Sequence, residues 1–228
     1  MKILICGNSD RTQELRGLIP EEHEVYESSE LSPELIESRQ DCDLFFDLNA
    51  DDHPGKIGPL LKIDHKPVFL SSVKKQLAEM IGKDTEVNSY VFGINALPGF
   101  MERGMLEVSM LDESNQAYSQ LKENLELLQI DFQRVDDRAG LVSPRVIMMI
   151  INEACYTLQE GTANKQDIDL SLKLGTNYPY GPFEWADIIG IKDVYETLNA
   201  IYEDTRDERY KICPLLKTYY LKGQPFFE

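Results

Sequence analysis

The stretch "KILICGNSDRT" at residues 2–12 indicates how the chain begins to fold. Its apolar start predicts a short buried strand, and Gly7 permits a tight turn directly after it. Leu15, Leu18 and Ile19 then recur at helical spacing, which predicts a helix over residues 11–19. A strand, a glycine turn and a helix together form the first unit of an α/β fold.

The same alternation continues along the first half of the chain. Further strands are expected at 24–28, 42–48, 67–72, 89–94 and 105–110. Further helices are expected at 32–40, 73–82 and 115–130, and the segment 51–59 is expected to be a loop. Strands that alternate with helices favour a mostly parallel sheet covered on both faces, so this half is predicted to be Rossmann-like.

The pattern changes after "DDRAG" at 136–140, and the remaining segments all have helical spacing. Helices are expected at 144–161, 164–175, 181–190, 192–205 and 213–223. The fold class is therefore predicted to be α/β, with a Rossmann-like domain at 1–138 followed by an all-helical domain at 139–228.

The composition limits the classes of partner. The 228-residue chain carries a net charge of −17, which disfavours binding to nucleic acid or to an anionic membrane surface. The four cysteines show no metal-ligand spacing, so no metal site is expected. The apolar run at the N-terminus is too short for a signal sequence, and no later run could span a bilayer. The protein is therefore expected to be cytoplasmic.

The glycine turn raises the question of a dinucleotide cofactor. In the G-x-G-x-x-G motif, glycines let a pyrophosphate approach backbone N–H groups at a helix N-terminus. Here Gly7 fits the first position, while Ser9 and Thr12 replace the second and third glycines. An ordinary turn capped by Ser9 or Asp10 is the alternative.

An acidic residue near the end of the second strand of such a motif bonds the ribose of the cofactor. Glu27 or Glu30 could take this role, although acidic residues at strand ends are more often simply solvated. The candidate cofactor residues are therefore Gly7, Ser9, Thr12 and Glu27.

The segment "DIDLSLKLGTNYPYGPFEWAD" at 167–187 is the most distinctive string of the chain. Together with the residues before it, from 140 onward, it resembles the C-terminal domain of the 3-hydroxyacyl-CoA dehydrogenase family, including its 3-hydroxybutyryl-CoA members. The resemblance implies a helical domain that forms a homodimer interface and closes over an acyl-CoA-type small molecule. It also implies NAD as the cofactor.

The resemblance extends weakly into the first domain through paired serines. The family has two serines between a strand and a helix, and this chain has Ser71 and Ser72 in "VFLSSVKKQL". By the resemblance, Ser71 would bond the 3-oxygen of the substrate. The alternative is that these serines cap the helix expected at 73–82.

The family next has a catalytic histidine, followed by a strand that bears a glutamate. Alignment of "GINALPGFMERGMLEV" without a gap places Asn95 on the histidine and Glu107 on the glutamate. A shift of one residue would place Ile94 and Leu106 there instead. Neither register supplies a histidine, and an amide cannot accept a proton at neutral pH.

Two hypotheses follow. In the first, the chain carries out NAD-linked oxidation of a 3-hydroxyacyl-CoA at an altered site that contains Glu107, Asn95 and Ser71. In the second, it is a non-catalytic dimeric family member that acts as an acyl-CoA-binding or interaction protein.

Overall fold

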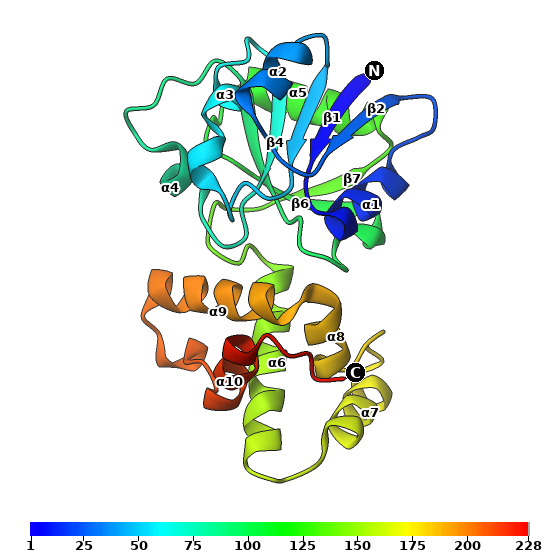
Figure 1. The fold of residues 1–228 in the computed structure, drawn as a ribbon, viewed down its shortest axis with the longest axis vertical. Coiled ribbons are helices and arrows are strands. Elements are labelled where there is room, and N and C mark those ends of the chain that lie inside the picture. Colours follow the sequence, from blue (N-terminus) through cyan, green and yellow to red (C-terminus); the bar gives the residue numbers. More distant parts are fainter. Residues whose placement is uncertain (228) are drawn as a thin grey trace. The chain divides into compact units, whose positions relative to one another are not determined.

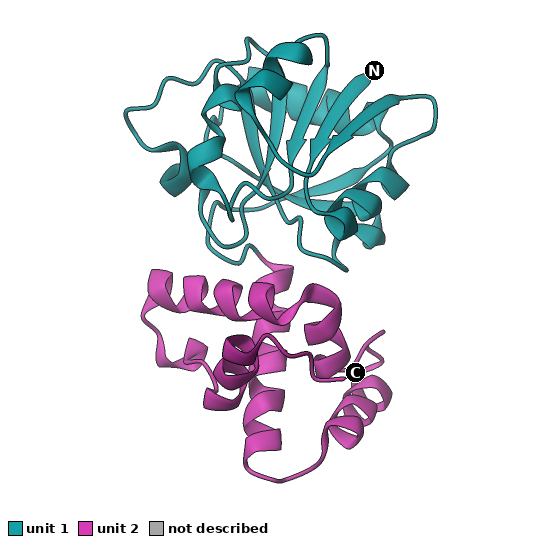
Figure 2. Ribbon diagram, viewed as in Figure 1, with its two compact units in different colours: residues 1–141 teal, residues 142–228 magenta. Residues whose placement is uncertain are grey.

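The computed structural model describes residues 1–227, and the chain divides into two compact units, Met1–Leu141 and Val142–Glu228 (Figure 2). The first unit holds a seven-stranded sheet, and within the described residues the second unit consists of helices and their connections. The predicted fold class, an α/β unit followed by an all-helical one, is confirmed.

The sheet of the first unit has the strand order β2-β1-β3-β4-β5-β6-β7 (Figure 1). Its strands are β1 (Lys2–Cys6), β2 (Glu24–Ser28), β3 (Leu44–Asp47), β4 (Pro67–Ser71), β5 (Tyr90–Ile94), β6 (Met105–Met110) and β7 (Asp131–Arg134). The strands from β2 to β5 pair in parallel, β6 pairs antiparallel with β5, and β7 pairs in parallel with β6. The sequence pattern missed β7, which is short and largely solvent-exposed.

Both faces of the central strands are buried, because their side chains are apolar on either side. Phe46, Phe69 and Phe92 lie side by side on one face, with ring centroids 4.8 and 5.1 Å apart. They belong to a core that includes residues of α1 (Ser9–Leu18) and α5 (Asn115–Leu127). We call this side of the sheet the α1 face.

The opposite face packs against shorter helices, and we call it the α4 face. Leu4, Phe45 and Leu70 lie there with residues of α2 (Pro33–Ser38), α3 (Gly58–Leu61) and α4 (Leu77–Ile81). The region 51–59, expected to be a loop, contains a 3₁₀ turn at Pro54–Lys56 and the start of α3.

The helix expected over 73–82 was predicted too long, since α4 begins only at Leu77. The backbone before it is held by Asp51, whose carboxylate accepts the N–H groups of Val73 and Lys74 at 2.9 and 3.0 Å. Capping of this helix by Ser72 is therefore wrong. Asp137 instead accepts the N–H groups at the start of α4.

The second unit contains five α-helices within the described residues. They are α6 (Ser143–Gln159), α7 (Lys165–Thr176), α8 (Pro182–Ile189), α9 (Ile191–Thr205) and α10 (Pro214–Lys222). The side chain of Asn164 caps α7, and the helix expected at 164–175 continues through Gly175 to Thr176, where Asn177 follows with a left-handed backbone.

Two residues of the distinctive string join α7 to α8. The buried Asp169 accepts the N–H groups of Phe183 and Glu184 at 2.8 and 3.1 Å, so a side chain of α7 caps the start of α8. A Cβ on Gly181 would lie 2.3 to 2.6 Å from the Asp169 atoms, so only glycine fits there. The string thus has a structural role in fixing this junction.

Candidate functional site

The chain crosses over at the carboxyl edge of the sheet between β1 and β3. From β1 it passes to β2 on one side, and from β2 it returns to β3 on the other side. In open α/β sheets, ligands bind in the crevice outside the strand ends at such a switch point. The segments that follow β1 and β3 here are Gly7–Asn8 and Leu48–Asp52, and they form the first candidate site.

A small polar cavity of about 200 Å³ opens at this point. It is lined by Cys6, Gly7, Ser29, Glu30, Leu31, Asp47, Asn49, His53 and Lys56. Glu30, the alternative ribose ligand, is among these residues, whereas Glu27 is exposed on the edge strand β2 and does not line the cavity.

Asp47 is the most unusual group of the cavity. It ends β3, it is only 4% exposed, and its Oδ1 accepts the N–H of Asn49 at 3.1 Å. Burial, with a smaller contribution from the nearby Asp51 carboxylate, raises the pKa of Asp47 to about 6. Burial together with Asp47 raises the pKa of the adjacent Cys6 thiol to about 12, so Cys6 is an inert thiol.

The turn after β1 is closed by the chain's own atoms. A Cβ on Gly7 would lie 2.9 Å from the Cβ of Leu48 and 3.1 Å from the Oγ1 of Thr12. Gly7 is therefore required by packing against these two neighbours. Thr12 is buried with its hydroxyl toward this turn, while Ser9 is exposed and donates to Asp10.

The N-terminus of α1 is already capped. The side chain of Asn8 accepts the N–H of Arg11 at 3.1 Å, and Asp10 places a carboxylate in the first turn. The sequence alternative of a cap at Ser9 or Asp10 is wrong, because Asn8, one residue before Ser9, provides the cap.

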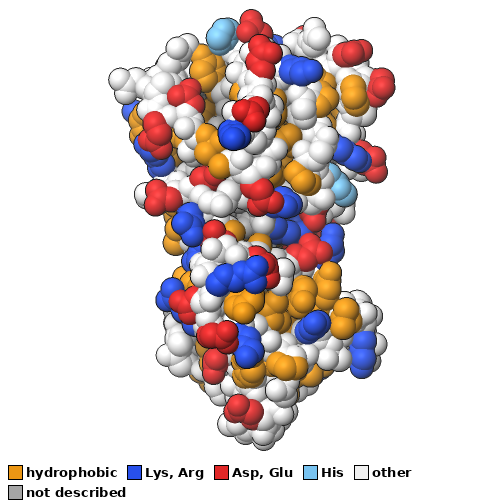
Figure 3. All heavy atoms as spheres, turned by 90° about the vertical axis from the view of Figure 1, so that its left-hand side faces the viewer, with side chains coloured by type: hydrophobic (Ala, Val, Ile, Leu, Met, Phe, Trp, Pro, Cys, Tyr) orange, Lys and Arg blue, Asp and Glu red, His pale blue; other side chains and the backbone are white. Residues whose placement is uncertain are grey.

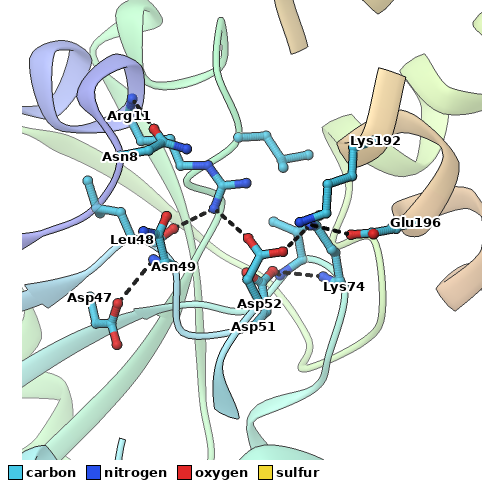
Figure 4. Close-up of polar contacts among 12 residues, drawn as sticks. Asn8, Arg11, Asp47, Leu48, Asn49, Asp51, Asp52, Lys74, Lys192 and Glu196 are labelled. Atoms are coloured by element: carbon cyan, nitrogen blue, oxygen red, sulfur yellow. Dashed lines mark hydrogen bonds and ion pairs between the residues drawn. The ribbon is translucent and has the colours of Figure 1, made fainter. Parts of the chain in front are cut away.

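Arg11 crosses the switch point, and sequence reasoning did not identify it. Its side chain is 1% exposed, and one guanidinium nitrogen donates to the carbonyl of Leu48 at 2.5 Å (Figure 4). The same nitrogen lies 3.5 Å from the carboxylate of Asp52, which also accepts the ammonium of Lys74 at 2.7 Å. Nothing in the local sequence predicted that this arginine, in the first turn of α1, would be buried.

The residues at this edge fit the diphosphate of NAD poorly. The anion would have to displace the Asn8 cap, approach the Asp10 carboxylate and accommodate the Arg11 side chain with its partner Asp52. The residues at this edge thus do not fit that part of the cofactor, and the NAD binding that the resemblance implies is untested by the structure.

A second group of predicted residues meets at the neighbouring strand ends. Ser71 is in register with Ile94, which is itself in register with Val108. One position further, the N–H of Asn95 donates to the carbonyl of Glu107 at 3.4 Å. The structure thus brings Ser71, Asn95 and Glu107 onto adjacent strands at one edge of the sheet.

The two serines lie on different faces of the sheet. Ser71 alternates with Leu70 and falls on the α1 face, whereas Glu107 lies between two α1-face residues and so points to the α4 face. Ser72 also lies on the α4 face, since its hydroxyl packs over Gly93. Ser72 is therefore placed on the face of Glu107, although Ser71 was the predicted residue.

Ser109 is a further buried hydroxyl that sequence reasoning missed. A Cβ on Gly93 would lie 2.2 Å from the Ser72 hydroxyl and 2.4 Å from the Ser109 hydroxyl. Both serines are fully buried, and neither hydroxyl has a hydrogen-bond partner among the described residues. A glycine in a buried strand was the available signal that side chains from neighbouring strands approach here.

Asn95 is held by its own loop. Its Oδ1 accepts the N–H of Leu97 at 3.2 Å, and the side chain is 4% exposed. The same loop is fastened to α1 by a hydrogen bond from the Gly99 N–H to Glu14, 2.6 Å long. Burial raises the pKa of Glu14. The Asn95 amide can orient neighbouring groups but can neither accept nor release a proton.

The four cysteines are buried and free, and no helix within residues 1–227 is both long and apolar enough to cross a membrane.

Known proteins resemble the chain most strongly in its helical unit. The family described as 3-hydroxyacyl-CoA dehydrogenase, C-terminal domain, matches residues 140–225. The resemblance of the helical unit to the C-terminal domain of the 3-hydroxyacyl-CoA dehydrogenase family is therefore confirmed.

Individual relatives agree with this assignment. The chain is 39% identical over 88 residues to the 3-hydroxybutyryl-CoA dehydrogenase of Bradyrhizobium diazoefficiens. The matched residues cover 39% of this chain and 30% of that protein. It is 40% identical over 84 residues to the 3-hydroxyadipyl-CoA dehydrogenase of Escherichia coli, and these residues cover 37% of this chain and 18% of the relative. The matched segment thus spans less than a third of either relative.

The fold of the whole chain is shared with solved structures. The (S)-3-hydroxybutyryl-CoA dehydrogenase of Ralstonia eutropha has a TM-score of 0.75, at 17% sequence identity, over 97% of this chain and 94% of that one. At this identity the likeness shows the fold alone. It supports a Rossmann-like first unit joined to a helical second unit.

Proposed function

We propose that this chain is a non-oxidising member of the 3-hydroxyacyl-CoA dehydrogenase family that binds an acyl-CoA-type ligand and assembles as a homodimer through its helical unit. The observation that carries the proposal is Asn95, which lies where alignment with the family places the catalytic histidine. Its amide already accepts the N–H of Leu97.

The loss of a general base argues against hydride chemistry. A positioned base contributes on the order of 10²–10⁴-fold to the rate, and an amide supplies none of it. Glu107 lies on the next strand and is 8% exposed, but its alignment matches the residue that orients the base. The capped N-terminus of α1 adds a second, independent argument, because it concerns the cofactor and not the substrate.

Exposed leucines support a homodimer through the helical unit. Leu170 and Leu174 lie four residues apart on α7 and are 52% and 78% exposed, so they share one face of the helix. Hydrophobic side chains also gather on the face of the second unit that Figure 3 shows. Exposed apolar surface of this kind marks interaction sites in proteins.

The ligand class follows from the relatives. Both relatives above are named as dehydrogenases of CoA thioesters, and the segment they share with this chain is the helical unit. We extend the CoA thioester, but not the oxidation, to this chain. The runner-up, NAD-linked oxidation of a 3-hydroxyacyl-CoA, is favoured by the same family match and makes the opposite prediction about turnover.

The test uses acetoacetyl-CoA with the full chain. We expect saturable binding in a calorimetric titration and no oxidation of NADH at 340 nm when both compounds are present. Turnover by the wild type would contradict the non-oxidising proposal, and absence of binding would contradict the ligand class. Light scattering should give twice the chain mass of 26.1 kDa, and the Leu174→Asp variant should lower it.

A further inference from the structure

Two buried cations meet at the carboxyl edge of β1 and β3. Arg11, in the first turn of α1, and Lys74, in the segment after β4, are 1% and 8% exposed. Burial of a charged group is costly unless the group is paired, so a structure with two such cations must provide an anion between them.

The anion is the carboxylate of Asp52. One oxygen lies 2.7 Å from the Lys74 ammonium, and the other lies 3.5 Å from the Arg11 guanidinium (Figure 4). Asp52 therefore bridges the two cations with separate oxygens. The contact with Lys74 is a charge-assisted hydrogen bond, and such bonds are about twice as strong as neutral ones.

The loop after β3 presents Asp52 in this position. The N–H of Asp52 donates to the carbonyl of Asn49 at 3.0 Å, which closes a turn. The neighbouring Asp51 fixes the other side of the bridge by accepting the N–H of Lys74. The two adjacent aspartates thus have different roles. Asp51 accepts a hydrogen bond from the backbone of Lys74, and Asp52 neutralises the side chains of Arg11 and Lys74.

The bridge occupies the place where this fold class holds a ligand anion. Arg11 follows β1 and contacts Leu48, which follows β3, so its side chain spans the switch point itself. We propose that Asp52 is an internal anion that fills this position and closes the crevice to phosphate-bearing ligands. Arg11 and Lys74 form a cation pair that would take a phosphate or diphosphate if Asp52 did not hold it.

Removal of the internal anion should convert the bridge into a binding site. The Asp52→Asn variant keeps the shape of the side chain but leaves the two cations without this carboxylate. We expect inorganic pyrophosphate, titrated calorimetrically into the full chain, to bind this variant at least tenfold more tightly than the wild type. Adding Arg11→Met to the variant should abolish the gain.

The matched control is Asp84→Asn, which removes the same charge from an exposed residue in the loop after α4. This variant should bind pyrophosphate as weakly as the wild type does. Equal affinity in Asp52→Asn and Asp84→Asn would overturn the proposal, and so would micromolar binding of pyrophosphate by the wild type.

A second variant covers the case in which Asp52→Asn folds poorly. Asp52→Ala leaves a carboxylate-sized space between the cations, and formate should raise its melting temperature more than that of Asp84→Ala. Ligand binding to the folded state alone stabilises it in this way. Equal responses to formate in the two alanine variants would also overturn the proposal.

These experiments are independent of Asn95 and of hydride transfer. Pyrophosphate carries no nicotinamide, and its binding involves no hydride transfer. If the Asp52 variants bind pyrophosphate no better than the wild type, the internal-anion proposal fails but the proposed function is unaffected. If the wild type turns over acetoacetyl-CoA, the proposed function fails, but a tenfold gain in pyrophosphate affinity would still support the internal anion.

Discussion

The α7–α8 junction of the helical unit and the β1–β3 edge of the sheet unit both depend on aspartates, which have different roles in the two places. At the junction, Asp169 accepts two backbone N–H groups, and the residues around it match the family string. At the sheet edge, Asp52 bridges Arg11 and Lys74. In the helical unit the aspartate thus belongs to the residues that match the family, while in the sheet unit we propose that the aspartate takes the place of a ligand anion.

The largest expected effect is a loss of stability in the helical unit. Gly181→Ala places a Cβ within 2.6 Å of the backbone of Asp169, and we expect a loss of about 3 kcal/mol in the stability of the second unit. Trp185 is the single tryptophan and is buried in α8, so its fluorescence during urea unfolding reports on this unit.

Gly175→Ala is the matched control for this substitution. Gly175 lies inside α7 with no atom within 4 Å of the added Cβ, so the change should stabilise the helix by about 0.5–1 kcal/mol. If the two alanine variants unfold at the same urea concentration, the close approach of Asp169 to Gly181 does not fix the junction.

A smaller effect is expected in the sheet unit, where the stability should depend on pH through Asp47. Because the folded-state pKa of Asp47 is about 6, above its ordinary value of 3.8, folding favours the protonated acid. Its contribution to stability is present below pH 3.8 and is lost as the pH rises to about 6. The shift corresponds to about 2–3 kcal/mol.

The Asp47→Asn variant cannot ionise and should lack this pH dependence. Hydrogen exchange of the β1 and β3 amides at pH 4.5 and 7.5 measures the local stability. We expect the wild type to lose protection relative to Asp47→Asn at the higher pH, while exposed Asp84→Asn follows the wild type. Parallel behaviour of wild type and Asp47→Asn would show that the carboxyl group is ionised freely in the fold.

Much of the fold could be predicted because its signals are local. Strands β1, β3 and β4 are apolar runs, and the caps Ser32 and Asn164 lie beside the helices that they start. The start of α4 could not be predicted, because it depends on Asp51 and Asp137 from distant segments.

The candidate site was predicted less completely, for the same physical reason. Asn95 and Glu107 belong to neighbouring strands and were brought together by alignment with the family. The burial of Arg11 depends on Leu48 and Asp52, about forty residues further along the chain, so no local pattern indicates it. The face on which each serine lies required the register of three strands.

We propose above that the sheet edge of the first unit is closed to the cofactor of the family. A calorimetric titration of NADH into the wild-type chain tests it most directly. We predict no saturable binding up to 1 mM (a Kd of about 1 mM corresponds to about −4.1 kcal/mol). Saturable binding with a micromolar dissociation constant would contradict the account.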